Sequence, residues 1–159
     1  MDMQSLSHQL LNITKEKHAM LEKVYQLTCQ QSEAIQEKQF EVFLSLSREK
    51  QELIDKLNEL NLLFQQQYDV AKKCPNGVRF PQILSKHIDL KEMQNIIADI
   101  NVITEKVKLR ELKNKEDYKK LLLDMTISVT QSMANRQDKI ARYKKMNDYK
   151  KKWKEKNSN

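Results

Sequence analysis

The chain has 159 residues, of which 39% are hydrophobic and 32% are charged, and its formal net charge is +7. A chain of this length normally forms one domain, and this apolar content is enough for a narrow helical core but low for a broad globular one. The β-branched alternation that strands need is also missing. We therefore predict an all-α fold with a single helical domain over residues 1–159.

The positive charge is concentrated at one end. Residues 135–159 contain ten Lys and Arg side chains against three acids, and the rest of the chain is neutral. The two cysteines, Cys29 and Cys74, have the spacing of neither a zinc site nor a disulfide framework, which favours a reducing compartment. The chain begins without a signal peptide pattern and has no run of about 20 apolar residues. We expect a cytoplasmic protein that does not insert into a membrane.

A first helix is predicted over residues 5–36. Its apolar positions recur at steps of four and three, which makes a heptad stripe. Lys17 and Gln31 interrupt this stripe, and polar breaks of this kind favour a bundle within one chain over a two-stranded coiled coil. The stripe consists of Leu6, Leu10, Ile13, Lys17, Met20, Val24, Leu27, Gln31 and Ala34.

A second helix is predicted over residues 39–71. Between the two stripes, residues 36–39 are all polar, which fits either a tight turn or a solvated stretch of one helix. Two arms of equal length, each about 45 Å at about 1.5 Å per residue, indicate an antiparallel helical hairpin. The second stripe consists of Phe40, Phe43, Ser47, Lys50, Ile54, Leu57, Asn61, Phe64, Tyr68 and Ala71.

A loop is predicted over residues 72–88. Pro75-Asn76-Gly77 is a turn signal, because proline fixes φ and the next two residues tolerate positive φ. A short helical turn near residues 83–87 is compatible with the sequence. Asp89, with Glu92 three residues later, resembles a capping pair that opens the next helix.

A long or bent helical region is predicted over residues 89–152, with the basic tail at 135–159. It is twice as long as either arm of the hairpin. Its first part, with an apolar stripe from Met93 to Val107, can complete a three-helix bundle, and Asn114 and Asp117 are candidate bending points. From Leu121 onward a second apolar segment either returns as a fourth bundle helix or keeps an uncovered face, since periodicity does not say what covers a face.

Catalytic motifs are missing from the sequence. It contains no GxGxxG, GxxxxGK[ST], HExxH or GxSxG pattern. His8, His18 and His87 are scattered, and the Glu-x-x-His pattern of dimetal bundles is absent. We predict that the chain is not an enzyme and that it uses no cofactor and no metal.

The basic tail has three interpretations. Tyr143, Tyr149 and Trp153 alternate with lysines, a mixture that can contact phosphates and stack on bases. Such a helix can also lie on an anionic membrane surface. The simplest interpretation is a soluble, partly frayed C-terminus whose lysines suit the negative end of the helix dipole. A homodimer through the long third helix is a further alternative.

One part of the chain resembles a known family. The helix segment Met20-Leu21-Glu22-Lys23-Val24-Tyr25-Gln26-Leu27 is followed, after a short polar turn, by Ser47-Arg48-Glu49-Lys50-Gln51-Glu52-Leu53-Ile54. This arrangement is similar to the FlgN family of flagellar type III export chaperones. The resemblance implies a cytosolic, non-enzymatic helical protein that keeps hook-filament junction (hook-associated) proteins unassembled and delivers them to the export gate.

The resemblance also implies a binding region, because members hold the C-terminal helical segment of the client with their own C-terminal region. Here the client would pair with the apolar face after Leu121, helix against helix. An aromatic residue near the C-terminus would contact the export gate, and Tyr143 is the candidate. The implied partner-binding residues are Leu122, Met125, Val129, Met133, Ile140 and Tyr143.

Overall fold

The computed structural model describes residues 2–73 and 80–157, and 95% of these are helical. Four helices and no strands are found in this part of the chain, which confirms the all-α prediction. The helices are α1 (Met3–Gln36), α2 (Phe40–Lys72), α3 (Phe80–His87) and α4 (Leu90–Lys156).

The chain divides into two compact units. Unit 1 is Met1–Glu116 and unit 2 is Asp117–Asn159. In unit 2, every described side chain from residue 122 onward is exposed. The expected long or bent region is one uninterrupted helix in the structure, since α4 continues through Asn114 and Asp117.

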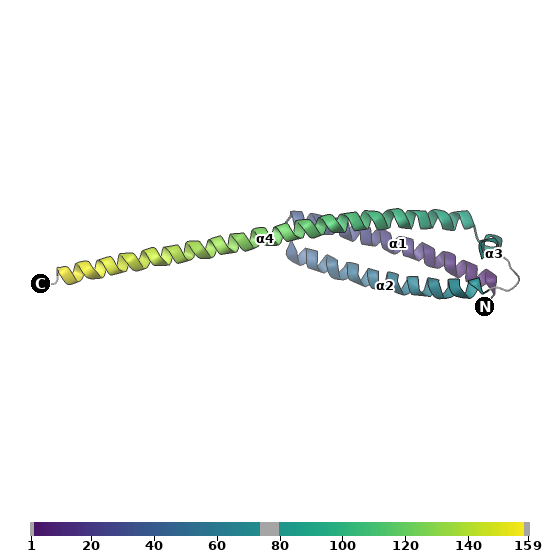
Figure 1. The fold of residues 1–159 in the computed structure, drawn as a ribbon, viewed down its shortest axis with the longest axis horizontal. Helices are drawn as coiled ribbons and strands as arrows, with labels where there is room; N and C mark the ends of the chain where they lie inside the picture. Colours follow the sequence, from purple (N-terminus) through teal and green to yellow (C-terminus); the bar gives the residue numbers. More distant parts are fainter. Residues whose placement is uncertain (1, 74–79, 158–159) are drawn as a thin grey trace. The chain divides into compact units, whose positions relative to one another are not determined.

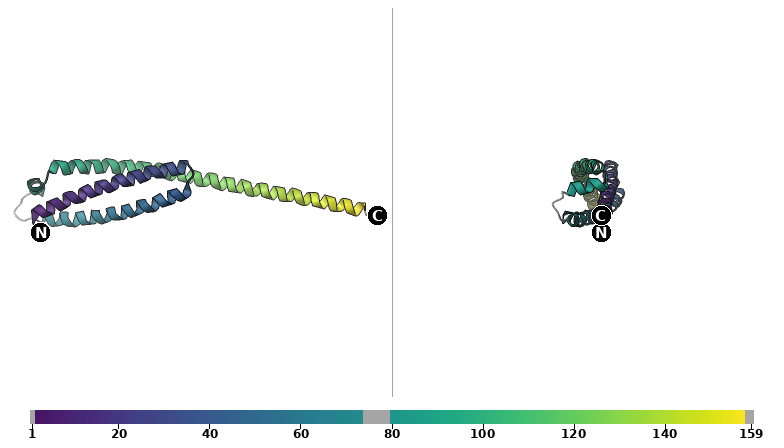
Figure 2. Two further views of the ribbon diagram at one scale, coloured as in Figure 1. Left: turned by 180° about the vertical axis from the view of Figure 1, so that it is seen from behind. Right: turned by 90° about the vertical axis from the view of Figure 1, so that its right-hand side faces the viewer.

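Unit 1 is a bundle of long helices. In Figure 1 and Figure 2, α1 and α2 run antiparallel, and the first part of α4 lies beside them in the direction of α1. This is the predicted hairpin, completed by a third long helix.

The expected loop at 72–88 contains a helix of its own, α3. Its Leu84 and the following Ile88 are buried against Leu10 and Leu11 of α1, so this segment caps one end of the bundle core. The Pro75-Asn76-Gly77 turn lies outside the described residues. Asp89 caps α4 as predicted, because its carboxylate accepts hydrogen bonds from the backbone N–H of Lys91 and of Glu92.

The turn between α1 and α2 is a Schellman motif. The Gln39 N–H donates to the Ala34 carbonyl at 2.8 Å, and the Lys38 N–H donates to the Ile35 carbonyl at 3.1 Å. Lys38 has a φ of 58°, the left-handed conformation that glycine usually supplies at this position. The polar stretch 36–39 is therefore a tight turn. Glycine would suit its left-handed position better than Lys38, because glycine has no Cβ.

Two apolar clusters fill the bundle. The first joins Leu10 and Leu11 of α1 to Met93 of α4, with Phe64 of α2 packed against it. The second, farther along, has one buried residue from each long helix, and they are Val24, Leu57 and Val107. Each cluster thus contains residues of all three long helices. In this way the bundle buries the narrow apolar stripe of each helix against the other two.

A layer of polar residues lies between the second cluster and the α1–α2 turn. The Lys50 ammonium lies 2.8 Å from the Gln31 Oε1 and 2.8 Å from the Glu111 carboxylate, and its side chain is only 13% exposed. Gln31 also donates from Nε2 to the Ser47 hydroxyl at 2.8 Å. The polar breaks of both stripes therefore meet each other, and they satisfy buried groups that would otherwise destabilise the fold.

Asn114 of α4 is buried beside this layer. Its Nδ2 donates to the Thr28 carbonyl at 3.0 Å, and its Oδ1 accepts from the Ser32 hydroxyl at 2.5 Å. Both partners belong to α1. Asn114 is therefore a specific attachment of α4 to α1, within a helix that continues past it.

Lys17, the other break in the first stripe, is half-buried. Its ammonium lies 5.4 Å from the centre of the Phe64 ring, which suits a cation–π contact. Burial lowers the pKa of Lys17. The charged Lys17 is thus tolerated in the apolar stripe of α1, because the face of the Phe64 ring partly replaces the water that would solvate its ammonium group.

Replacing Lys38 by glycine should stabilise unit 1. Glycine has no Cβ to clash in the left-handed conformation, and after the greater entropy loss of glycine on folding is subtracted, we expect a gain of about 0.5–1 kcal/mol. Urea unfolding followed by circular dichroism measures this. Lys38→Ala, which keeps the Cβ, is the matched control. An equal effect of both substitutions would mean that the left-handed residue carries no strain.

Replacing Asn114 by alanine should destabilise unit 1 by about 1–3 kcal/mol, because two buried hydrogen bonds to α1 are lost. Lys115→Ala, at the exposed neighbouring position, should stay within about 0.5 kcal/mol of the parent protein. Thermal unfolding of the two variants under identical conditions gives the comparison. Equal melting temperatures would contradict an anchoring role for Asn114.

Candidate partner-binding face

Unit 2 consists of the last part of α4. Every described residue from Leu122 to Asn157 is exposed. The six predicted partner-binding residues are among them, from Leu122 at 42% exposure to Tyr143 at 71%. A Leu in a lone helix is shaded by its own neighbours one turn away, so 42% still describes an uncovered side chain.

The six residues share one side of the helix. At about 100° per residue, Leu122, Met125, Val129, Met133, Ile140 and Tyr143 fall within an arc of about 80°. We call this set the apolar stripe. Arg136 lies in the same arc and is its one charged member. The arrangement is a continuous ridge about 30 Å long at about 1.5 Å per residue, suited to contact with another elongated element.

The spacing along the apolar stripe mixes intervals of eleven and seven residues. Met133 follows Leu122 by eleven positions, and Ile140 follows Val129 by the same interval. Val129 follows Leu122 by seven positions, and Ile140 follows Met133 by seven. The two intervals drift around the helix in opposite senses, so a helix that pairs along this stripe stays nearly straight, unlike a heptad coiled coil.

Two further apolar side chains lie on the other side of the same segment. Leu123 and Ile127 are also exposed, and they point between about 80° and 180° away from the members of the stripe. The predicted partner-binding residues did not include them. Leu123 and Ile127 can serve as controls in binding experiments. They are apolar and exposed like the residues of the stripe, but they point to another side of the helix.

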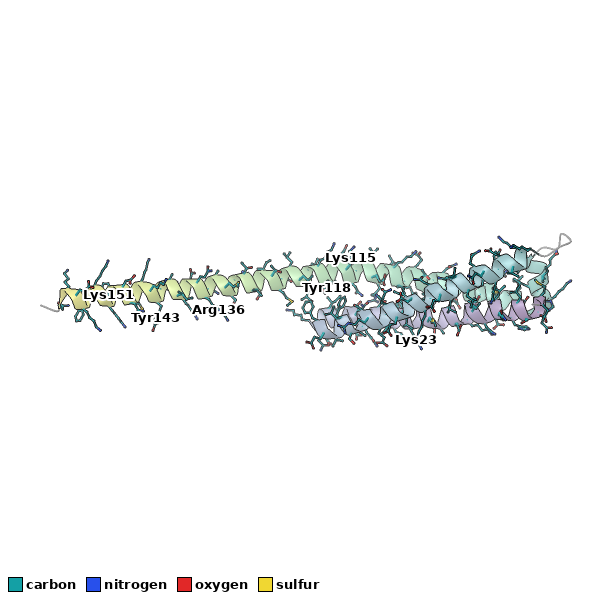
Figure 3. All side chains as sticks on the ribbon, turned by 90° about the horizontal axis from the view of Figure 1, so that it is seen from below. Lys23, Lys115, Tyr118, Arg136, Tyr143 and Lys151 are labelled. Atoms are coloured by element: carbon teal, nitrogen blue, oxygen red, sulfur yellow. The ribbon has the colours of Figure 1, made fainter. Side chains whose placement is uncertain are left out.

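The end of α4 holds residues that the predicted site did not include. Tyr149 and Trp153 are exposed and are surrounded by lysines. The side chains of Arg136, Tyr143 and Lys151 project away from α4 (Figure 3). The alternation of aromatic and basic residues is visible in the sequence. Tyr149 and Trp153 share one face only because the helix continues to Lys156. A frayed tail would give them no common face.

The described part of the chain offers little for other kinds of site. Within residues 2–73 and 80–157, no three His, Cys, Asp or Glu side chains gather where they could hold a metal ion. His18 instead lies 3.6 Å from Glu22 on the surface of α1. None of the described helices has both the length and the apolar character that crossing a membrane requires.

Backbone amides of residues 122–140 should exchange with solvent at least about 100-fold faster than those of residues 20–31 in α1, because no packing protects the former. Hydrogen exchange of the isolated full-length protein with peptide-level mass spectrometry measures both. Similar protection in the two segments would mean that the apolar stripe is covered in solution.

Comparison with known proteins identifies no relative that has a similar face. Neither the models of known protein families, nor the curated proteins, nor the solved structures contain a match to this chain. The exposed stripe and the residues around it are therefore the features of this chain that indicate a function.

Proposed function

We propose that the chain is a cytosolic export chaperone of FlgN type. Its apolar stripe binds the C-terminal helical segment of a flagellar hook-filament junction protein, keeps that segment from assembling, and brings it to the type III export gate. The chaperone catalyses no reaction. The observation that carries this proposal is the exposure of all six stripe residues on one side of a continuous helix.

The energetics suit reversible binding. Burial of one large apolar side chain contributes about 1.5–3 kcal/mol before the cost of ordering the partner. Several such side chains, offset by that cost, give a complex that is stable but can be released. An amphipathic client helix is the natural occupant, since it presents its own apolar ridge at helical spacing.

Unit 1 supports this role as a scaffold. Its core is closed by contacts among its own helices, and its buried polar side chains are largely paired within the same bundle. It can therefore fold before a client arrives. Tyr143, at the C-terminal end of the stripe, is the residue that we assign to the export gate.

The direct test is binding of the full-length protein to a synthetic peptide that carries the C-terminal helix of a hook-filament junction protein from the same organism. Val129→Asp should weaken this binding at least about 10-fold, because it places a charge in the buried ridge. Isothermal titration calorimetry provides the affinities.

Ile127→Asp is the matched control, because it introduces the same charge at a β-branched, exposed position outside the stripe, and it should change the affinity by no more than about 2-fold. Absence of binding by the parent protein would refute the proposal. Sedimentation of the same samples tests the homodimer: a dimer that Val129→Asp converts to a monomer would show that a second copy occupies the stripe.

A further inference from the structure

The last turns of α4 carry a second face, distinct from the apolar stripe. Tyr149 and Trp153 are separated by four residues, which places them on the same side of the helix, and they are 73% and 61% exposed. An open hollow in the helix surface adjoins both rings. It is lined by Asn147, Tyr149, Lys150, Lys151, Trp153 and Lys154.

Charge is distributed unevenly around this part of the helix. Arg142 and Lys150 lie within about 100° of both aromatic rings, on the same side. The two acids in this stretch, Asp148 and Glu155, are seven residues apart and share a different side, about 100° to 160° away from the rings. The aromatic face therefore carries positive charge only, and it is complementary to a ligand that combines flat apolar groups with negative charge.

Two classes of surface have that combination, namely nucleic acids and anionic membranes. A helix that lies in a membrane interface buries a broad apolar face, in which Leu and Phe stand beside Trp. After Ile140 the sequence has no Leu, Ile, Val or Phe, and Met146 is the one large aliphatic side chain. The face thus has two aromatic rings that can stack on bases but little of the aliphatic surface that an interfacial helix buries.

We propose that this face binds single-stranded nucleic acid. A base stacks on the rings of Tyr149 and Trp153, and the neighbouring phosphates contact Arg142 and Lys150. The proposal does not depend on the export function, because it uses side chains beyond the apolar stripe.

The geometry of the two rings agrees with this ligand. Four residues of helix advance about 6 Å along the axis. A base inserted between two rings needs about 6.8 Å, which is two stacking steps of about 3.4 Å. A small adjustment of the two side chains, both free of packing constraints, brings them to this separation. A duplex, whose bases are already stacked on each other, offers no free base to this face.

Trp153 provides the measurement, because it is the single tryptophan of the chain. Titration of the full-length protein with single-stranded 12-mers of RNA and of DNA should quench its fluorescence, and a duplex of the same length should bind more weakly. Raising the salt from about 50 to about 200 mM should reduce the affinity about 100-fold if five phosphates are neutralised.

Substitutions separate stacking from general attraction to a basic tail. By anisotropy of a labelled oligonucleotide, Tyr149→Ala and Trp153→Ala should each weaken binding about 10-fold, while Trp153→Phe should retain most of the affinity. Lys150→Gln should weaken binding more than Lys144→Gln, although each removes one charge, because Lys144 is exposed on the opposite side of the helix from both rings.

Several outcomes would overturn the proposal. One is equal effects of Lys150→Gln and Lys144→Gln together with an unchanged affinity of Trp153→Ala, which would reduce the tail to a nonspecific polycation. A second is binding of polyglutamate as tight as that of the oligonucleotides. A third is a Trp153 blue shift with phosphatidylserine vesicles but no quenching by oligonucleotides, which would assign the face to a membrane surface instead.

Discussion

The burial of α1 is the constraint on which the rest of unit 1 depends. Twelve residues of α1 are buried, against two of α2. Both apolar clusters and the polar layer include a residue of α1, and α3 closes over its first turns. The positions of α2 and α4 along the bundle are thus set by what α1 offers them. The most buried helix contributes hydrogen-bonding groups as well as apolar surface, and these groups fix the register more sharply than apolar contacts do.

Much of this fold follows from periodicity alone. The first stripe predicted a helix over 5–36, and α1 spans Met3–Gln36. Gln31 and Lys50 could be recognised only as interruptions, because their pairing joins residues of different helices and depends on the finished register. Asn114 shows the same limit. A polar residue in a helix suggests exposure or a bend until a partner such as the Thr28 carbonyl is found across the bundle.

The candidate site divides in the same way. The sequence identifies which side chains share a side of the helix, because that needs only the helical repeat. It does not say how exposed they are, and in the structure the six residues from Leu122 to Tyr143 are exposed within unit 2. The sequence shows Tyr149 and Trp153 as aromatic residues among lysines. They lie on the same side of a helix only because α4 continues to Lys156.

The mixed seven- and eleven-residue spacing of the apolar stripe has a consequence for partner choice. A helix with a strict seven-residue repeat turns its apolar side gradually around its axis, so it meets this ridge over a few turns and then diverges from it. A helix with the same mixed spacing remains in contact from Leu122 to Ile140. Selectivity can then arise from the pitch of the partner's pattern, a property of its whole length, and single substitutions in a partner would leave it largely intact.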